Sequence, residues 1–162
     1  MKVIFLDIDG VLNPQVDYEI DDLLKNNGVK TKRNYKTFSK RCMDNLNDLI
    51  KETGAKVVIS STWRIGYSQE MLQKHFESQG FEYKILDYTP SLGYDTVRGN
   101  EIRSWLNKHK DIENYVIIDD DNDMLLYQKP HFCLVDSWGG LTPNHIYKIK
   151  NFFDGKTMSV SV

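Results

Sequence analysis

The chain has 162 residues, of which 40% are hydrophobic and 27% are charged, and its formal net charge is −2. This length is typical of one domain with its own core, and the composition excludes a disordered or fibrous chain. The nearly neutral charge gives no general argument for binding to nucleic acid or membrane, and no apolar stretch approaches membrane-spanning length. Two cysteines are too few for a disulfide framework. Because Asp7 interrupts the N-terminal apolar run, we expect no secretory segment and a cytoplasmic protein with a single domain over residues 1–162.

The N-terminal stretch, MKVIFLDIDGVLN, combines an apolar run with a pair of acids. Val3 to Leu6 are consecutive apolar residues, which predicts a short strand buried on both faces. Asp7 and Asp9 follow where this strand would end, and Gly10 lets the chain turn sharply out of the sheet. Two carboxylates this close repel each other unless a cation or a shared proton lies between them. Taken alone, such a pair of acids is usually a buried strand followed by an Asx turn.

The next segment, residues 14–37, is polar and has an uneven distribution of charge. Four acids lie within residues 17–22, whereas residues 25–41 contain seven basic residues and no acid. An Asn-Asn-Gly sequence at 26–28 supplies turn residues between the two parts. We expect a small flap or loose hairpin over residues 14–37, next to the acid pair. The alternative interpretation is an ordinary solvated face.

The remainder of the chain alternates between helical and extended patterns. Helices are expected after Ser39, with Phe38 and Met43 as a hydrophobic staple, after Ser68, after residue 101, and from Thr142 onward. Apolar runs predict strands at residues 56–60, 81–86, 115–118 and 131–135. The tail at 156–162 is expected to be loosely held. This alternation predicts an α/β fold with an open, mainly parallel, Rossmann-like sheet of about five strands and helices on both faces.

Three of the predicted strands end in polar clusters. These clusters are Asp7 and Asp9, then Ser60, Ser61 and Thr62, and finally Asp119 and Asp120. Because ligands bind at the carboxyl ends of the strands in open α/β sheets, we expect the three clusters to meet at one edge. Carboxylates without a His or Cys cluster form a hard oxygen site, for which Mg²⁺ is the natural cation.

Such a site suits phosphoryl transfer. One Asp of the first pair can attack phosphorus, and its neighbour can carry a proton to and from the leaving oxygen. Hydroxyl groups at the second strand end can hydrogen-bond the phosphoryl oxygens. A cation at the start of a helix, such as Arg98, can neutralise the charge of the transferred group.

The motifs, in this order, resemble those of the haloacid dehalogenase (HAD) superfamily of phosphotransferases over residues 1 to about 153. DIDGVLN matches the first motif, which implies Asp7 as nucleophile and Asp9 as general acid and base. The second motif implies a hydroxyl from Ser61, with Ser60 as the alternative. Arg98 occupies the position of the third motif, where the superfamily more often has Lys.

VIIDDDND matches the acidic fourth motif. The resemblance implies Asp120 as a metal ligand supported by Asp119, beside Asp7 and Asp9, with Mg²⁺ as cofactor. The combination DIDGVLN, SSTWR, RGNEI and IIDDD is most similar to the small capless HAD domains associated with RNA-repair proteins. A capless domain implies an open site, which suits a phosphate on a large substrate such as a nucleic-acid end.

Several further residues are candidates for substrate binding. They are Ser60, Thr62 and Arg64 after the second strand, and Lys32 and Arg33 in the flap, where basic residues attract a polyanion locally. Tyr35 and Trp63 are candidates for stacking on a base, and ordinary packing is the alternative for Trp63.

The sequence therefore predicts a Mg²⁺-dependent phosphomonoester hydrolase that works through an aspartyl-phosphate intermediate. Its expected substrate is an accessible phosphate, such as that of a nucleic-acid end, and no membrane partner is expected. One alternative is a mononucleotide 5′- or 3′-nucleotidase with the flap as a small lid. A second is a non-catalytic phosphate-binding regulatory module, which the presence of both Asp7 and Asp9 disfavours.

Overall fold

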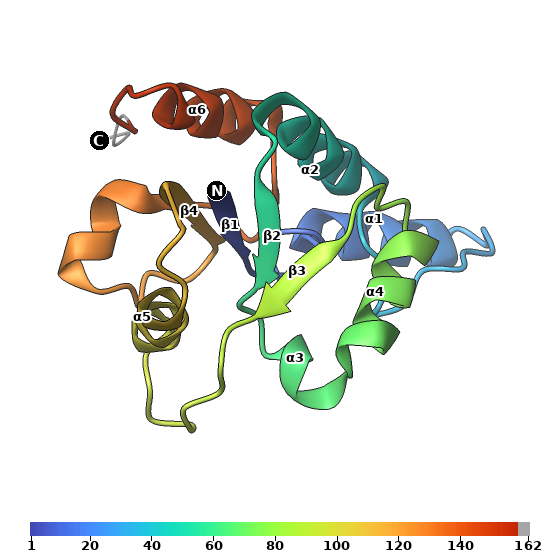
Figure 1. The fold of residues 1–162 in the computed structure, drawn as a ribbon. Helices are drawn as coiled ribbons and strands as arrows, with labels where there is room; N and C mark the ends of the chain where they lie inside the picture. Colours follow the sequence, from blue (N-terminus) through green and yellow to red (C-terminus); the bar gives the residue numbers. More distant parts are fainter. Residues whose placement is uncertain (159–162) are drawn as a thin grey trace.

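The computed structural model describes residues 1–158 of the chain, and the last part of the predicted tail lies outside the described residues. Five strands form one parallel sheet in the order β3-β2-β1-β4-β5 (Figure 1). The strands are β1 (Lys2–Leu6), β2 (Lys56–Ile59), β3 (Ile85–Tyr88), β4 (Asn114–Asp119) and β5 (Phe132–Leu134). This confirms the predicted α/β fold with an open parallel sheet, and it places β1 at the centre.

Helices cover both faces of this sheet. They are α1 (Gln15–Asn26), α2 (Lys40–Thr53), α3 (Trp63–Gly66), α4 (Gln69–Ser78), α5 (Arg98–Lys108) and α6 (Pro143–Phe153), with a 3₁₀ turn η1 (Leu126–His131) before β5. In Figure 1, α2 and α6 lie together over one face and α5 lies against the other. Within the described part of the chain, no helix is both long and apolar enough to cross a membrane.

The two faces of β1 contribute to two separate cores, as expected for a strand buried on both sides. Ile4 and Leu6 pack with residues of α2, α4 and α6. Val3 and Phe5 point to the other side and pack with α5, where the Phe5 and Trp105 rings meet edge to face at 5.3 Å. Burial on both faces fixes the register of β1, and with it the position of the residues that follow the strand.

The predicted helix starts are confirmed at Ser39, Ser68 and Thr142, which are the N-cap residues of α2, α4 and α6. The third strand, however, begins four residues later than residue 81. Phe81 is buried in the core, and the backbone N–H of Glu82 donates to the side chain of Asn47 at 3.1 Å. The Asn47 side chain of α2 thus accepts the backbone hydrogen bond that a neighbouring strand would otherwise accept.

The prediction of a loose hairpin over residues 14–37 is wrong, because half of this segment is the helix α1. An acid, Asp17, lies in its first turn and a base, Lys25, lies in its last turn, which complements the helix dipole. Lys25 also pairs with Asp21 one turn earlier. The chain then continues without regular structure to α2. We call residues 27–39 the basic loop.

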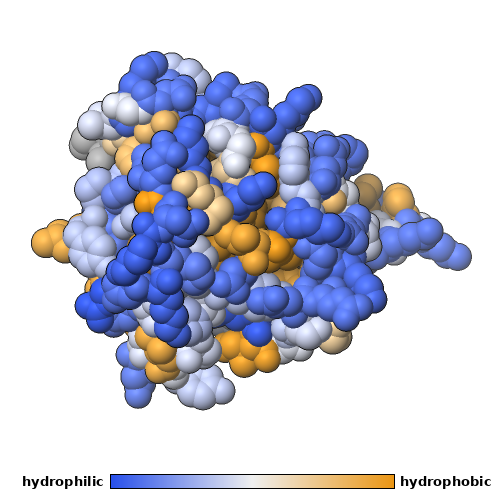
Figure 2. Space-filling view, in the orientation of Figure 1, coloured by the Kyte–Doolittle hydropathy of each residue, from blue (hydrophilic) through white to orange (hydrophobic). Residues whose placement is uncertain are grey.

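Figure 2 shows the same view with side chains, and most of this face is hydrophilic. An apolar area appears near the centre, where β3 forms the edge of the sheet. Leu86 of β3 is 43% exposed.

Candidate active site

The three central strands bring the predicted polar clusters to one edge of the sheet. Leu6 is level with Ile59 of β2 and with Ile118 of β4. The backbone N–H of Asp7 donates to the Ile118 carbonyl at 2.9 Å, and that of Ser60 donates to the Leu6 carbonyl at 2.9 Å. Parallel pairing therefore continues one residue past β1, and it holds Asp7 between the ends of β2 and β4.

Three carboxylates gather at this edge. Asp7, Asp119 and Asp120 each offer an oxygen, and these three oxygens lie within 4.8 Å of one another. Asp119 Oδ1 accepts from the backbone N–H of Asp121 at 3.0 Å, whereas Asp119 Oδ2 is buried without a hydrogen-bond partner among the described residues. A buried carboxylate oxygen without a donor needs another positive group. The donor set is all oxygen and strongly acidic, so it fits a hard divalent cation such as Mg²⁺.

The pKa values of these carboxyl groups also indicate a site that needs a positive charge. Burial raises the pKa of Asp7 to about 7, and the nearby Asp120 adds to the rise, while Arg98 opposes it. Burial also raises the pKa of Asp119 to about 8, and repulsion from Asp7 contributes. Without a cation, therefore, the cluster favours binding a proton, since like charges this close are costly in a buried site.

Gly10 allows the close approach of the first turn to this cluster. Its φ of 73° lies in the left-handed region, and a Cβ atom there would lie 2.3 Å from Asp120 Oδ2. Any larger residue would both strain the backbone and displace the Asp120 carboxylate.

Arg98, the first residue of α5, places its guanidinium group among the carboxylates. Its Nη2 lies 3.9 Å from Asp7 Oδ1, and its Nε lies 3.7 Å from Asp119 Oδ2. These separations exceed direct hydrogen bonds, so the cation acts on the cluster through charge. Asp123 holds this end of α5, because its Oδ2 accepts from the Arg98 backbone N–H at 2.8 Å. Gly99 allows the close packing of α5, since a Cβ there would lie 2.6 Å from the Leu125 backbone nitrogen.

Of the two serines after β2, Ser61 faces the nucleophile candidate. Its Oγ accepts from the Trp63 backbone N–H at 3.4 Å, and the interaction of this hydroxyl with Asp7 lowers the pKa of that carboxyl. Ser60 is also buried, but its Oγ has no hydrogen-bond partner among the described residues. The geometry thus favours Ser61 over Ser60 as the hydroxyl of the second motif. Thr62 is exposed beside them and does not cap α3 with its side chain.

Arg64 was expected to bind substrate, but the structure uses its guanidinium group internally. Its Nε donates to the Thr89 carbonyl at 2.9 Å, and its Nη1 donates to the Ser61 carbonyl at 2.5 Å. Its Nη2 pairs with Glu101 Oε2 at 2.5 Å, and only 4% of its side chain is exposed. These contacts describe a group that holds the loop after β2, and they leave little of it for a substrate.

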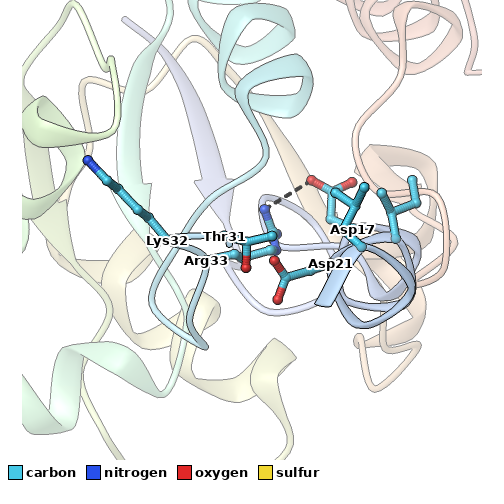
Figure 3. Close-up of a pocket in the computed structure, with 7 residues that line it drawn as sticks. Asp17, Asp21, Thr31, Lys32 and Arg33 are labelled. Atoms are coloured by element: carbon cyan, nitrogen blue, oxygen red, sulfur yellow. Dashed lines mark ion pairs between the residues drawn. The ribbon is translucent and has the colours of Figure 1, made fainter. Parts of the chain in front are cut away.

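The basic residues of the flap fall into two classes. Arg33 closes the basic loop onto α1, since its Nη1 lies 3.2 Å from Asp17 Oδ2 and its Nη2 donates to the Thr37 carbonyl at 3.2 Å. It lines a cavity of about 350 Å³ with Asp17 and Asp21. Lys32 extends away from these two acids (Figure 3). Arg33 is thus committed to the flap, whereas Lys32 is exposed and stays a prediction for substrate binding.

Asp9 lies apart from the three-carboxylate group. Its side chain is exposed, and its two oxygens accept from Asn13 Nδ2 at 2.6 Å and from Trp63 Nε1 at 2.9 Å. The structure therefore gives no support to a metal-ligating role for the Asp9 side chain. Sequence reasoning did not identify Asn13 as a partner of Asp9. The available signal was its position four residues later in DIDGVLN.

Comparison with known proteins agrees with this geometry. Residues 3–146 match the family model described as the HAD domain in Swiss Army Knife RNA repair proteins. Among solved structures, a haloacid dehalogenase-like family hydrolase from Streptococcus pneumoniae matches with a TM-score of 0.50 and 15% sequence identity, over 91% of this chain and 90% of the other. The comparison with curated proteins gave no significant match. The chain therefore belongs to the HAD superfamily of hydrolases, in the family of HAD domains found in Swiss Army Knife RNA repair proteins.

Proposed function

We propose that the chain is a Mg²⁺-dependent phosphomonoester hydrolase that forms an aspartyl-phosphate on Asp7. The observation that carries this proposal is the position of Asp7 itself. It lies between the other two carboxylates, the Arg98 guanidinium and the Ser61 hydroxyl, at the carboxyl end of the central strand. A nucleophile, a cation-binding cluster and two groups suited to phosphoryl oxygens therefore share one site.

The steps assign a separate task to each residue. The Asp7 carboxylate forms a bond to phosphorus while the bond between phosphorus and the leaving oxygen breaks, and Asp9 gives a proton to that oxygen. Asp9 then takes a proton from the water that attacks the aspartyl-phosphate, which releases phosphate and restores Asp7. Ser61 would hydrogen-bond a phosphoryl oxygen, and Arg98 would offset the negative charge.

Asp7, Asp119 and Asp120 are the residues that would hold Mg²⁺. When bound, the ion would neutralise the cluster and draw charge from the phosphoryl group. Its presence would also keep Asp7 ionised as a nucleophile, although burial alone raises the pKa of that carboxyl.

For the substrate we propose a phosphorylated nucleic-acid end. The family description names RNA repair, and the exposed lysines of the basic loop offer positive charge that would attract a polyanion. A mononucleotide remains the competing substrate, and the experiment below separates the two.

The test compares phosphate release from a 3′-phosphorylated oligonucleotide, a 5′-phosphorylated one, free mononucleotides and an aryl phosphate, each with Mg²⁺ and with a chelator. We expect Mg²⁺-dependent release that is fastest from one class of oligonucleotide end. Equal rates in chelator would contradict the metal assignment, and faster release from mononucleotides would favour a nucleotidase. An added alcohol should capture the same fraction of phosphate from every substrate, because all pass through one aspartyl-phosphate.

A further inference from the structure

We propose that Trp63 is a positioning residue for Asp9, and that its indole N–H, together with the Asn13 amide, holds the proton-transfer carboxylate in place. This inference rests on the proposed function, since it assumes that Asp9 moves the proton. It also replaces the interpretation of Trp63 as a surface on which a base stacks.

The first observation is that both oxygens of the Asp9 carboxylate already have donors. Asn13 Nδ2 donates to Oδ1 at 2.6 Å, and Trp63 Nε1 donates to Oδ2 at 2.9 Å. The side chain is exposed, and an exposed Asp would otherwise sample several rotamers. Two donors that come from different parts of the chain restrict it to one.

The second observation concerns the donors, which are themselves fixed. Asn13 Oδ1 accepts from the Gly10 backbone N–H at 3.0 Å, which orients the amide so that its NH₂ group faces Asp9. The turn after β1 thus supplies one of the two donors to the Asp9 carboxylate and fixes the orientation of that donor.

The third observation is the packing of the Trp63 ring. It stacks on Tyr67 at 5.5 Å and 15°, and it also packs against Phe38 at 5.6 Å and His75 at 5.6 Å. These neighbours pack against the half-buried ring, and its N–H edge is directed at Asp9. A ring held in this way is poorly suited to stacking on a base, but it is well suited to fixing the direction of one hydrogen bond.

The position of Trp63 in the chain adds a functional reason. It lies two residues after Ser61, as the first residue of α3, so the loop after β2 and the start of this helix together place a hydroxyl near Asp7 and an N–H on Asp9. The loop therefore sets the relative position of the nucleophile and the proton donor. Small displacements of a proton donor reduce rates most for leaving groups that need the proton.

The kinetic test uses Trp63→Phe, which keeps an aromatic ring but removes the N–H. For an alkyl phosphate, whose leaving group needs a proton, we expect kcat to fall by about tenfold or more. For an aryl phosphate with an activated leaving group, kcat should stay within about twofold. Half-saturation by Mg²⁺ should not change, because Asp9 lies outside the three-carboxylate group. An equal loss on both substrates would overturn the proposal.

Two controls separate positioning from general damage. Tyr67→Phe keeps the ring that stacks on Trp63, and Tyr67 makes no hydrogen bond to Asp9 among the described residues. We therefore expect kcat to change little, and by a similar factor, on both substrates. In an Asp9→Asn background, Trp63→Phe should have no further effect on the alkyl phosphate, because the two residues act as one unit. If the two losses multiply instead, Trp63 does not act through Asp9.

A second measurement does not need activity. The indole N–H proton of Trp63 should exchange slowly with solvent, as followed in ¹H–¹⁵N correlation NMR spectra. Asp9→Ala should make that exchange faster. The indole of Trp105 is an internal reference, since it donates to Asp87 at 2.7 Å and should not respond. Unchanged exchange at Trp63 in Asp9→Ala would overturn the positioning role even if the enzyme proved inactive. An inactive enzyme with the expected exchange would instead contradict only the proposed function.

Discussion

Arg64 Nη2 and Glu101 Oε2 form a buried ion pair at 2.5 Å that joins α3, which follows the loop after β2, to the first turn of α5. Only 4% of the Arg64 side chain and 8% of the Glu101 side chain are exposed. The other Glu101 oxygen accepts from the Leu92 backbone N–H at 3.1 Å, and Arg98 Nη1 lies 3.9 Å from Oε2. Glu101 therefore connects the loop that carries Ser61 with the cation that faces Asp7.

Glu101→Gln keeps the shape of the side chain but leaves the Arg64 charge without its counter-ion. Because removing one partner of a buried pair is costly, we expect the free energy of unfolding to fall by about 3 kcal/mol or more, measured by denaturant titration. Phosphate release should also fall, since Arg98 loses one of its neighbours. Glu70→Gln, in an exposed pair with Lys74, is the matched control and should change neither quantity appreciably.

Asp120→Asn removes one charge from the carboxylate group while preserving its size. We expect the Mg²⁺ concentration for half-maximal activity to rise by about tenfold or more, because a hard ligand is replaced by a neutral one. Ca²⁺ should substitute poorly, since its larger and looser shell would misplace Asp7. Asp121→Asn changes the neighbouring exposed acid and should leave the Mg²⁺ requirement unaltered. A similar shift in both variants would place the ion elsewhere.

The pH dependence of stability has a defined sign in chelator. The pKa values of Asp7 and Asp119 are raised in the folded state, so folding binds protons at these groups. Their contribution to stability is greatest at low pH and is lost as the pH rises through about 7 to 8. The lowered pKa of His145 changes stability with pH in the opposite direction. The contribution of the carboxylates is therefore best isolated by comparing the wild type with a variant that lacks one of them.

Asp119→Asn supplies that difference, because it removes the buried charge. In chelator we expect this variant to melt at a higher temperature than the wild type at pH 8, with a gap that narrows toward pH 5. Added Mg²⁺ should raise the melting temperature of the wild type more than that of the variant. A wild type that is more stable than the variant at pH 8 in chelator would contradict the raised pKa values.

The exposed lysines of the basic loop should matter for polyanions only. Lys30→Ala with Lys32→Ala should raise KM for a phosphorylated oligonucleotide and flatten its salt dependence, by roughly 0.7 in slope for each lost contact. The same change should leave kcat/KM for an aryl phosphate within about twofold. The control pair, Lys108→Ala with Lys110→Ala, lies at and beyond the end of α5 far from Arg98 and should affect neither substrate. Equal effects from the two double variants would show that the basic loop is an ordinary solvated face.

The sequence predicted the parts of the site that depend on short stretches of chain. The apolar runs before Asp7, Ser60 and Asp119 identified buried strands, and parallel pairing brought their ends together. The flap was misjudged because α1 has few buried residues, so its helical pattern is weak beside its charge pattern. The start of the third strand was predicted too early, because the side chain of Asn47 on α2 accepts from the Glu82 backbone N–H.

Contacts between distant side chains were beyond sequence reasoning. Trp63 and Asp9 are separated by 54 residues, and Arg64 and Glu101 by 37 residues. Nothing in local spacing distinguishes a Trp whose N–H reaches a carboxylate from one that only packs. The same holds for Arg64, since an Arg after a strand serves equally well as an anion ligand or as a buried support for a loop.

The central place of β1 bears on how the chain refolds. Asp7 meets Asp119 only after β1 has paired with β4, and Lys2 pairs there with Asn114, more than a hundred residues away. Such long-range pairing forms late and slowly, so no early intermediate would carry the complete group of carboxylates. Mg²⁺ would then have nothing to bind until the final step, and it would slow unfolding while leaving the rate of refolding almost unchanged.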